Sequence, residues 1–584
     1  MRGAARLTPK HETLQGALAA AAQGASGLTF VDLQEHEKFV SYREFYHRAR
    51  QAAAFLEKEG VRPGDRVALI LSTSPGFVDA IFGTVLAGAI PVPLYPPLRL
   101  GKLDDYHAST ARMLSVTGAR LVVTEPRIRI LLGRSLSQAR PQLGYRLADE
   151  LISEGNERGL SGHPEEVALI QFSSGATMDP KPVCLSHRNL LYQCAALHAL
   201  LLQSSPPPHR GVSWLPLYHD MGLIGALFNA VYYPGPLVLI PPEHFLARPG
   251  LWLRAISRHR ATASFGPNFG YALCVKRVRE RELENVDLSS WRLAGNGAEP
   301  ISTKVMRRFC EKFSRWGFAP RAFTPGYGLA EASLAVTYAV PGEPPKSLSV
   351  DAARLASAGE AVAGDFEIVS VGRPILGTEV EIRNEWGARA PDRRVGRIHV
   401  RSPSVMSGYF GGFDPAAPAL SNGWLDTGDL GFTDDGELYI CGRAKDLVII
   451  RGANHSPQEF ESCLEEVEGV RPGCAVALGF VPPDADGEQL LILAERGPRA
   501  HLHLEEKIRS AVLERTGILA HTVRILEPGT LPRTSSGKLR RREALRQFLA
   551  NQLKPPRPVT AARMAREVIR SALGLARLGL VDEG

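Results

Sequence analysis

The chain has 584 residues, of which 44% are apolar and 22% are charged, and its formal net charge is +8. This composition is that of an ordinary globular protein, and the length predicts roughly two to four domains instead of one core. The seven cysteines form no CxxC pair, which argues against a disulfide framework and against a zinc site and favours reduced thiols in a cytoplasmic setting.

Strands and helices alternate in the first third of the chain. Apolar runs predict strands at 66–71, 90–94 and 120–124, and helical stretches at 43–59 and 76–87 lie before and between them. Because strands that alternate with helices usually form a parallel sheet with both faces covered, we expect an α/β fold. The first residues contain no apolar stretch long enough for a signal peptide.

The next predicted strand, 167–171, leads into a loop of small residues that is followed by a helix at 186–202. The loop reads Ser173-Ser174-Gly175-Ala176-Thr177-Met178-Asp179-Pro180-Lys181. Glycine and hydroxyl side chains let backbone N–H groups approach phosphate oxygens, and a lysine adds positive charge. The loop lacks the GxxxxGK[ST] pattern of the ATPase P-loop, so by itself it is either a phosphate site or a structural turn.

A segment without charged side chains spans 221–242 and is long enough to cross a bilayer. Asn229 and the breaker Tyr233-Pro234-Gly235-Pro236 interrupt it. We therefore expect a buried helix, a turn and a buried strand at 237–240, and no stable membrane insertion. A further strand at 261–265 precedes a helix that ends at Glu284.

The pattern changes from about residue 378, where short strands separated by turns predict a β-rich subdomain. Beyond 446, a compact α+β stretch extends to about residue 548. Lys554-Pro555-Pro556-Arg557-Pro558 then predicts a stiff linker before a final helix rich in Ala, Arg and Leu.

Positive charge is concentrated near the end of the chain, in Lys538-Leu539-Arg540-Arg541-Arg542 and in the final helix. These residues form either a solvated helical face or a docking surface for an acidic partner. No aromatic residues are interleaved with the basic cluster, so we expect no nucleic-acid partner.

Several motifs, taken in order along residues 12–548, resemble those of the ANL adenylate-forming enzymes, which include acyl-CoA synthetases, peptide-synthetase adenylation domains and luciferases. They are the loop at 174–181, Trp214-Leu215-Pro216-Leu217-Tyr218-His219-Asp220-Met221-Gly222, Asn296-Gly297-Ala298-Glu299-Pro300, Thr324-Pro325-Gly326-Tyr327-Gly328-Leu329-Ala330-Glu331, Trp424-Leu425-Asp426-Thr427-Gly428-Asp429 and Gly442-Arg443-Ala444-Lys445-Asp446.

The resemblance implies a large N-terminal domain at 1–441, made of two parallel α/β subdomains and a β-rich subdomain, a hinge at 442–446 and a small mobile α+β domain at 447–548. The remaining residues, 549–584, are the Pro-rich linker and the basic helical tail. ATP and Mg²⁺ are the implied cofactors.

The resemblance also implies roles for individual residues. Lys538, in Arg533-Thr534-Ser535-Ser536-Gly537-Lys538-Leu539, would bridge the carboxylate and the α-phosphate when the small domain closes. Glu331 and Thr177 would hold Mg²⁺, and Lys445 would be the hinge residue. The implied nucleotide-binding residues are Ser173, Ser174, Gly175, Thr177, Lys181, Gly297, Ala298, Glu299, Tyr327, Gly328, Asp429 and Arg443.

His219-Asp220 is not accompanied by HExxH or a GxSxG elbow, so neither a metal site nor a serine triad is indicated. The resemblance makes His219 a wall of the acyl pocket or a neighbour of the carboxylate, with ordinary packing as the alternative. A fatty tail is held by burial. We expect an apolar tunnel for this tail, and the candidates for its wall are Trp214, Met221, Phe265, Phe269 and Leu329. Each of these residues could equally belong to the hydrophobic core.

Within this family the chain is most similar to fatty acyl-AMP ligases. Two runs resemble signatures of that branch: Ile90-Pro91-Val92-Pro93-Leu94-Tyr95-Pro96-Pro97 and residues 217–225. The stretch between Val340 and Gly372 lies where that branch carries its insertion. By resemblance the insertion disfavours coenzyme A. Met178 and Pro182 stand where glycine is usual in the wider family, and proline removes one N–H donor.

The expected activity is ATP-dependent activation of a medium- or long-chain fatty acid to acyl-AMP, followed by transfer to the phosphopantetheine thiol of an acyl carrier protein. No carrier domain with an Asp-Ser-Leu site follows Asn551, so we expect the carrier to act in trans. The alternatives are a fatty acyl-CoA ligase and, more remotely, a non-catalytic binding protein with a degenerate site.

Overall fold

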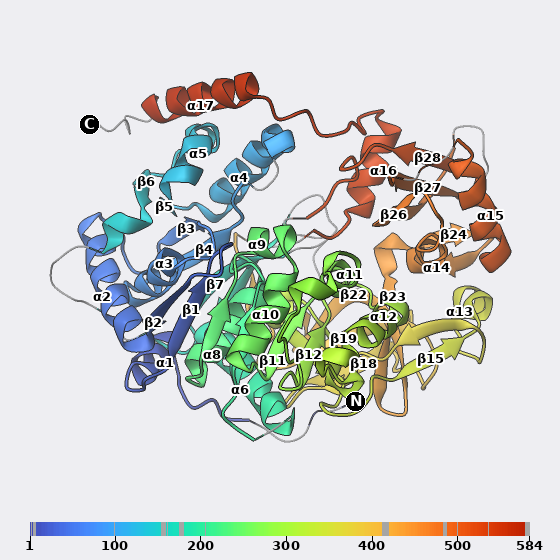
Figure 1. Ribbon diagram of the computed structural model, residues 1–584, viewed down its shortest axis with the longest axis horizontal. Helices are drawn as coiled ribbons and strands as arrows, with labels where there is room; N and C mark the ends of the chain where they lie inside the picture. The colour runs from blue at the N-terminus through green and yellow to red at the C-terminus, as the bar shows by residue number, and fades with distance from the viewer. Residues whose placement is uncertain are drawn as a thin grey trace.

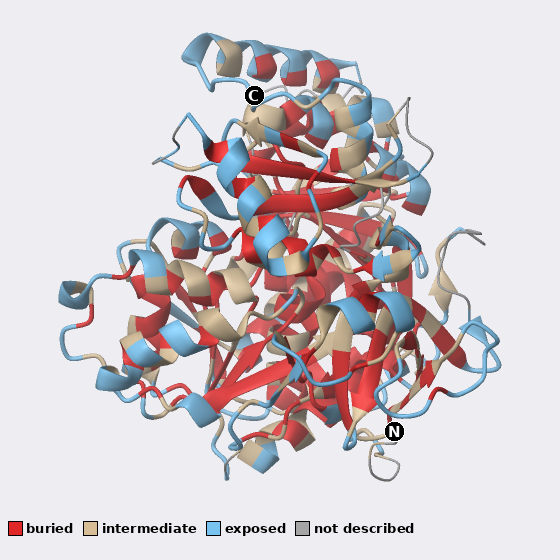
Figure 2. Ribbon diagram, turned by 90° about the vertical axis from the view of Figure 1, so that its right-hand side faces the viewer, coloured by how far each residue is buried: buried red, intermediate tan, exposed pale blue. Residues whose placement is uncertain are grey.

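The computed structural model describes residues 1, 3, 7–97, 100–152, 159, 162–173, 180–204, 206–411, 420–482, 487–498, 500, 502–534 and 537–577. Its larger part contains two sheets built mainly of parallel strands and a β-rich subdomain, and a smaller α+β domain follows in the chain (Figure 1). Buried residues run along the strands of the interior, and the outer faces of the helices are exposed (Figure 2). This is the α/β architecture that the sequence predicts.

The first sheet has the order β4-β3-β5-β6, and all neighbouring strands are parallel. The strands predicted from apolar runs are confirmed, because nearly every side chain along them is buried. The bounds are β3 Arg66–Ile70, β4 Ile90–Leu94, β5 Leu121–Thr124, β6 Tyr145–Leu147, and for the helices α2 Tyr42–Lys58, α3 Pro75–Leu86, α4 Leu103–Thr117 and α5 Pro126–Ala139.

The second sheet has nine strands in the order β17-β14-β13-β12-β11-β9-β10-β1-β2. Its central strands are parallel: β1 Gly27–Val31, β10 Leu237–Leu239, β9 Gly211–Ser213, β11 Ala263–Gly266, β12 Leu293–Asn296 and β13 Phe323–Gly328. The outer strands run antiparallel: β2 Glu37–Ser41, β14 Ala335–Tyr338 and β17 Arg373–Pro374. The carboxyl ends of β11, β12 and β13 therefore share one edge, where ligands bind in open α/β sheets.

The uncharged segment 221–242 folds as expected into helix, turn and strand. It comprises α7 Asp220–Gly222, the π-helical turn η3 Leu223–Phe228, α8 Asn229–Tyr232 and β10. Among the residues that the structure describes, no helix is both long and apolar enough to cross a bilayer.

The two strands that flank the Gly-rich loop pair with each other, which the sequence did not predict. β7 Val167–Phe172 pairs antiparallel with β8 Pro182–Ser186, and only then does helix α6 His187–Ser204 begin. All residues of β8 are buried. The expected order of strand, loop and helix is therefore corrected, because a short strand separates the loop from the helix.

The β-rich subdomain contains β18 Glu379–Arg383, β19 Gly396–Arg401, β22 Trp424–Asp434 and β23 Glu437–Arg443, which pair antiparallel. The stretch 340–372 forms the antiparallel pair β15 Ser347–Val350 and β16 Phe366–Val369, with helix α13 Ala352–Ala358 between them. Helix α13 contacts β25 Ala453–His455, which follows the hinge segment.

The small domain has its own core, which includes Val448, Phe460, Ile492, Ile508 and Val523. Its elements are β24 Val448–Ile450, α14 Pro457–Cys463, β26 Val470–Phe480, β27 Gln489–Arg496, α15 Leu504–Thr516, β28 Thr522–Leu526 and α16 Arg541–Leu549, besides β25. Strand β26 is antiparallel to β27, and β27 is parallel to β28.

The C-terminal helix α17 Ala561–Ala576 leaves the small domain and packs on α5 of the first sheet (Figure 1). The Gly133 N–H donates to Ser571 Oγ at 2.8 Å, and Arg134 pairs with Glu567 at 3.2 Å. A Cβ on Gly574 would lie 2.5 Å from the carbonyl oxygen of Gly133, so the two backbones approach as only glycine allows.

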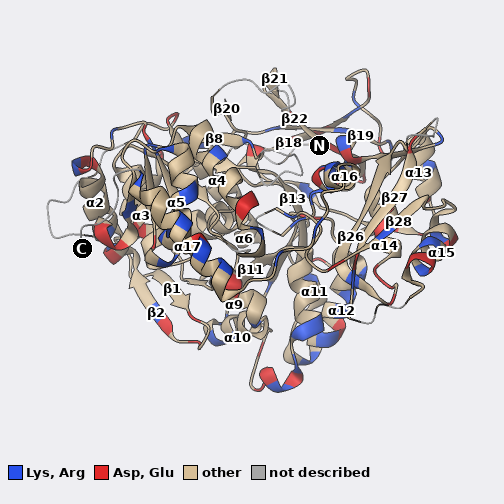
Figure 3. Ribbon diagram, turned by 90° about the horizontal axis from the view of Figure 1, so that it is seen from above, with Lys and Arg blue, Asp and Glu red and all other residues tan. Residues whose placement is uncertain are grey.

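The basic cluster also has partners inside the chain. Arg541 pairs with Glu461 at 2.6 Å, and Arg542 donates to the carbonyl of Lys445 at 3.1 Å. Helix α17 carries both acidic and basic side chains (Figure 3). The docking surface for an acidic partner stays a prediction.

Candidate active site

Lys538 lies on a tight loop of the small domain that reaches the large domain. The Thr534 N–H donates to the carbonyl of Lys538 at 2.8 Å, and the Lys538 N–H donates to Thr534 Oγ1 at 3.0 Å. A Cβ on Gly537 would stand 3.9 Å from the Phe269 ring. The loop is therefore seated against the helix α11 Asn268–Arg277, which follows β11.

Lys538 is half-buried, and its ammonium interacts electrostatically with charged groups of the large domain and of the hinge. Burial lowers the pKa of Lys538, while the carboxylates of Asp220, Glu299 and Asp429 oppose this effect and Arg443 adds to it. The structure thus brings Lys538 to residues that come from four other motifs. A cation in this position can stabilise negative charge that develops beside it.

Asp429 is the centre of a hydrogen-bonded group. The hydroxyl of Tyr327 donates to Asp429 Oδ2 at 2.6 Å, and Arg443 Nε donates to Oδ1 at 3.0 Å. The register of β22 and β23 places Asp429 directly opposite Arg443. Burial, followed by the charge of Asp429, raises the pKa of Tyr327, so the phenol stays a donor.

Glu331 is buried in the turn η7 Ala330–Ala332, after β13. Its Oε1 accepts a hydrogen bond from the Tyr409 hydroxyl at 3.0 Å. Burial raises the pKa of Glu331, and the charges of Arg443 and Lys181 act in the opposite direction. The Lys181 ammonium lies 5.4 Å from the centre of the Tyr409 ring.

The residues around Glu331 fit a magnesium ion that is bound together with phosphate. Among the described residues, no group of three or more His, Cys, Asp or Glu side chains could hold a metal ion. Mg²⁺ usually keeps several waters and takes one or two carboxylates plus substrate phosphates. A single buried carboxylate near Lys181 matches this donor set and does not match a cage made of protein ligands alone.

The Gly-rich loop is described at its two ends. The Ser173 N–H donates to the carbonyl of Lys181 at 2.9 Å, and the Lys181 N–H donates to Ser173 Oγ at 3.3 Å. The predicted phosphate-binding residues Ser174, Gly175 and Thr177 lie outside the described residues, as does Met178.

The loop after β12 contacts the start of the next motif. A Cβ on Gly297 would lie 2.6 Å from the carbonyl oxygen of Gly326. A Cβ on Gly328 would lie 1.8 Å from the carbonyl oxygen of Leu334. Ala298 has φ of +69°, and Glu299 Oε1 accepts from the Phe269 N–H at 2.6 Å. One edge of the second sheet thus holds five of the predicted nucleotide-binding residues: Gly297, Ala298, Glu299, Tyr327 and Gly328.

His219 and Asp220 begin helix α7 beside Lys538. His219 Nδ1 lies 2.7 Å from Asp220 Oδ1, which also accepts from the Met221 N–H at 2.7 Å. Burial opposes ionisation of Asp220, but His219 and Lys538 outweigh it and lower the pKa of this carboxyl. Asp220 therefore remains ionised and is a charge partner of Lys538.

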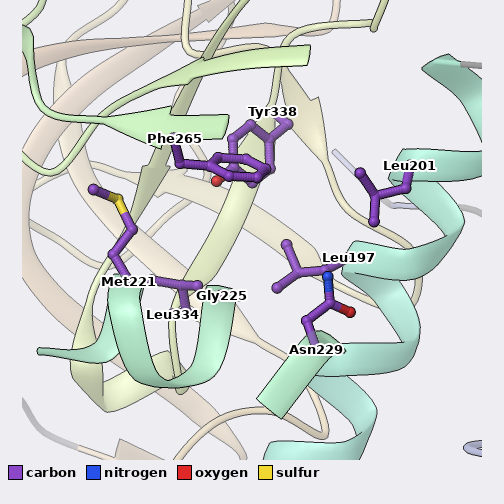
Figure 4. A pocket seen from close by; sticks show the side chains of 8 residues that line it. All are labelled: Leu197, Leu201, Met221, Gly225, Asn229, Phe265, Leu334 and Tyr338. Atoms are coloured by element: carbon purple, nitrogen blue, oxygen red, sulfur yellow. The ribbon is translucent and has the colours of Figure 1, made fainter. Parts of the chain in front are cut away.

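Two adjoining cavities lie behind this group. The first, a narrow space of about 10 Å³, is lined by Leu197, Leu201, Met221, Gly225, Asn229, Phe265, Leu334 and Tyr338 (Figure 4). The second has about 220 Å³ and shares Leu201, Gly225, Asn229 and Phe265 with the first. Asp220 influences Tyr338 electrostatically, so the narrow cavity begins beside the charged group.

Of the residues predicted to line the acyl tunnel, the structure places Met221 and Phe265 on the cavity wall. Trp214 stacks on Phe245, with ring centres 3.8 Å apart, inside an aromatic cluster. Phe269 lies edge-on to Trp214 and close to Gly537. Leu329 packs between the second sheet and the β-rich subdomain.

The hinge segment is the turn η8 Ala444–Asp446, which follows β23. Gly442 has φ of +134°, a backbone conformation that other residues rarely adopt. Lys445 is exposed and its carbonyl accepts the hydrogen bond from Arg542.

Sequence reasoning overlooked three residues of this site: Asp220, Tyr338 and Tyr409. Asp220 belongs to a motif that was recognised, and its place next to His219 was the available signal. Tyr338 and Tyr409 stand outside all the motifs and reach the site through strand pairing of β14 and β20 Gly408–Tyr409.

Comparison with known proteins decides the family. The model of AMP-binding enzymes matches residues 18–410, and that of the AMP domain of Disco-interacting protein 2-like proteins matches residues 445–556. The chain belongs to the AMP-binding enzymes. This confirms the resemblance to adenylate-forming enzymes that the motifs indicated.

Similar AMP-binding enzymes are known over almost the full chain. A putative acyl-CoA synthetase of Caulobacter vibrioides is 36% identical, with 92% of this chain and 95% of the relative covered. The medium-chain-fatty-acid–[acyl-carrier-protein] ligase JamA of Moorena producens is 33% identical, with 89% and 92% covered. A solved structure from a study of fatty acyl-adenylate ligases from E. coli and L. pneumophila has a TM-score of 0.86 and 34% identity and covers 93% of this chain and 98% of its own.

Proposed function

We propose that this AMP-binding enzyme is a fatty acyl-AMP ligase. It joins a medium- or long-chain fatty acid to the α-phosphate of ATP, releases pyrophosphate, and transfers the acyl group to the phosphopantetheine thiol of an acyl carrier protein in trans. The observation that carries the proposal is the position of Lys538, whose ammonium interacts with the charges of Asp220, Glu299 and Asp429, while Met221, the neighbour of Asp220, lines the narrow cavity.

In the first step a carboxylate oxygen attacks the α-phosphorus and the bond to pyrophosphate breaks. Attack of one anion on another is opposed by charge repulsion, and Lys538 reduces it by lying between them. Holding both groups in one geometry lowers the barrier further. In the second step the thiol sulfur attacks the acyl carbon, and AMP leaves as the thioester forms.

The nucleotide would lie along the edge formed by β12, β13 and β22. Asp429, oriented by Tyr327 and Arg443, would accept hydrogen bonds from the ribose hydroxyls, and Gly328 would leave room for the base. Adenine would contact the loop Gly297-Ala298-Glu299, and the phosphates would contact Lys181, Ser173 and the loop between them. Glu331 and Thr177 would hold Mg²⁺, which supplies charge neutralisation between the phosphates.

Two observations support a carrier thiol as the acceptor. Helix α13 of the stretch 340–372 contacts β25 of the small domain. This contact would have to change when the small domain changes its orientation. JamA, by its name, acts on an acyl carrier protein. The hinge at 442–446, with Lys445, would let the small domain turn between the two steps.

A fatty acyl-CoA ligase is the second candidate, because the Caulobacter relative is named a putative acyl-CoA synthetase. Both candidates share the first step, and they differ only in the thiol that accepts the acyl group.

Mass spectrometry of the products separates the two candidates. The enzyme is incubated with ATP, Mg²⁺ and fatty acids of graded length, with either coenzyme A or a holo acyl carrier protein. We expect acyl-AMP in every mixture and acylated carrier as the thioester product. Acyl-CoA as the major thioester would assign the enzyme to the second candidate.

A further inference from the structure

The larger of the two cavities is not uniformly apolar. Beyond the shared residues its wall includes His198, Pro207, Pro208, His209, Arg210 and Tyr233. The narrow cavity extends from Met221, the neighbour of Asp220, past Phe265 to Asn229. The larger cavity continues from Asn229 to His198 and His209. An alkyl chain whose carboxylate meets Lys538 would follow this direction.

Asn229 presents a polar atom at the junction of the cavities. The residue is 9% exposed, and its side-chain Oδ1 has no hydrogen-bond partner among the described residues. Figure 4 shows this side chain extending from α8 towards Leu197, with the amide nitrogen nearest Leu197 and the oxygen turned to the side. A buried amide oxygen without a partner is costly, and an unbranched saturated chain cannot satisfy it.

His209 presents two more such atoms at the far end. Neither Nδ1 nor Nε2 has a hydrogen-bond partner within the described part of the chain, and both are buried. The His198 ring lies 6.3 Å from that of His209 and stacks on Tyr233 with ring centres 3.7 Å apart. A purely aliphatic end group would leave both imidazole nitrogens unsatisfied.

The two imidazoles are neutral at physiological pH. Burial lowers the pKa of His198 to about 4, with His209 and Lys10 contributing, and burial and Arg292 lower that of His209. A neutral imidazole offers one donor and one acceptor. A hydroxyl group also donates and accepts once, so it complements this surface better than a methyl group does.

Resting on the proposed function, we propose that the enzyme selects fatty acids that carry a hydroxyl group on the chain. The amide of Asn229 binds a hydroxyl at the junction of the cavities, and His209 binds a hydroxyl at the chain end. Met221 is unbranched and adaptable, so its movement opens the narrow cavity to the chain. Since burial already accommodates the methylene groups, these polar atoms decide which acid is preferred.

The test compares acids of equal length that differ only in a hydroxyl group, either in mid-chain or at the end. The rate of pyrophosphate release gives kcat/KM for each acid, and the ratio of hydroxylated to plain acid is the readout. This ratio is independent of the fraction of folded enzyme. We expect at least one hydroxylated acid to be favoured roughly tenfold, the effect of about one buried hydrogen bond.

Variants assign the preference to its residues. Asn229→Leu removes the preference for a mid-chain hydroxyl, and His209→Phe removes that for a terminal one. Leu197→Met changes the cavity wall without altering a polar group, so it leaves both ratios as in the wild type.

Three results would overturn the inference. They are a wild-type preference for plain acids, ratios that neither variant changes, and a stronger preference for an acid with a second carboxylate at its end. In each case plain acids are still activated, so the proposed function stands. Absence of pyrophosphate release with every acid would instead contradict the proposed function itself.

Discussion

At the scale of single residues, the candidate site is a set of charges that no local segment could assemble alone. Asp429 accepts hydrogen bonds from Tyr327 and Arg443, and its charge interacts electrostatically with Lys538. The donors on Asp429 hold its carboxylate in one orientation. That rigidity suits a group proposed to bind the two ribose hydroxyls.

Asp429→Asn keeps the shape of this side chain and removes its charge. Because hydrogen bonds to charged groups contribute about 1.5–3 kcal/mol, we expect KM for ATP to rise roughly ten- to hundredfold. KM for the fatty acid should change much less. Steady-state kinetics with each substrate varied in turn measure both constants.

The matched control is Asp434→Asn, at the other end of β22, where the carboxylate pairs with Arg393 at the surface. This variant should bind ATP as the wild type does. Equal KM values for ATP in Asp429→Asn and the wild type would remove Asp429 from the nucleotide site.

At the scale of elements, the sequence predicts best those strands that are continuous apolar runs and are buried. Strands β3, β4 and β5 are found close to their expected bounds because uninterrupted apolar runs need cover on both faces. Strand β8 was not anticipated, since it is short and opens with Pro182. The contacts of Tyr338 and Tyr409 with the site depend on pairing of distant strands, which a single sequence does not reveal.

The docking of α17 on α5 is the clearest case of a contact that local patterns could not predict. Gly133 lies against the backbone of Ser571 and Gly574, which are far from it in the chain. The composition of the tail predicted a helix, with either a solvated face or a face that docks an acidic partner, and not a helix packed on α5.

Gly574→Leu tests the docking of α17. A Cβ at this position would lie 2.5 Å from the Gly133 carbonyl, so a leucine forces the helices apart, at a cost of about 1–3 kcal/mol. We expect faster proteolytic cleavage within the linker 549–560. Ala572→Leu, on the exposed face of the same helix, is the control and should be cleaved at the wild-type rate. Equal cleavage of all three proteins would show that this contact does not hold the helix.

At the scale of the whole molecule, the small domain contacts the large one at several separate places. Lys538 enters the charged site, α13 contacts β25, and Lys304 pairs with Glu466 at 2.7 Å. The tail then returns to the first sheet through α17. These contacts hold the arrangement in which the amine of Lys538 lies near Asp220, Glu299 and Asp429, which is the arrangement that the proposed first step requires.

The rate of pyrophosphate release from ATP in the presence of a fatty acid tests this account most directly. We predict release that depends on the fatty acid, and a loss of roughly 10²- to 10³-fold in Lys538→Met, as expected when a group that stabilises developing charge is removed. Release by Lys538→Met at the wild-type rate, or no release by the wild type with any fatty acid, would contradict the account.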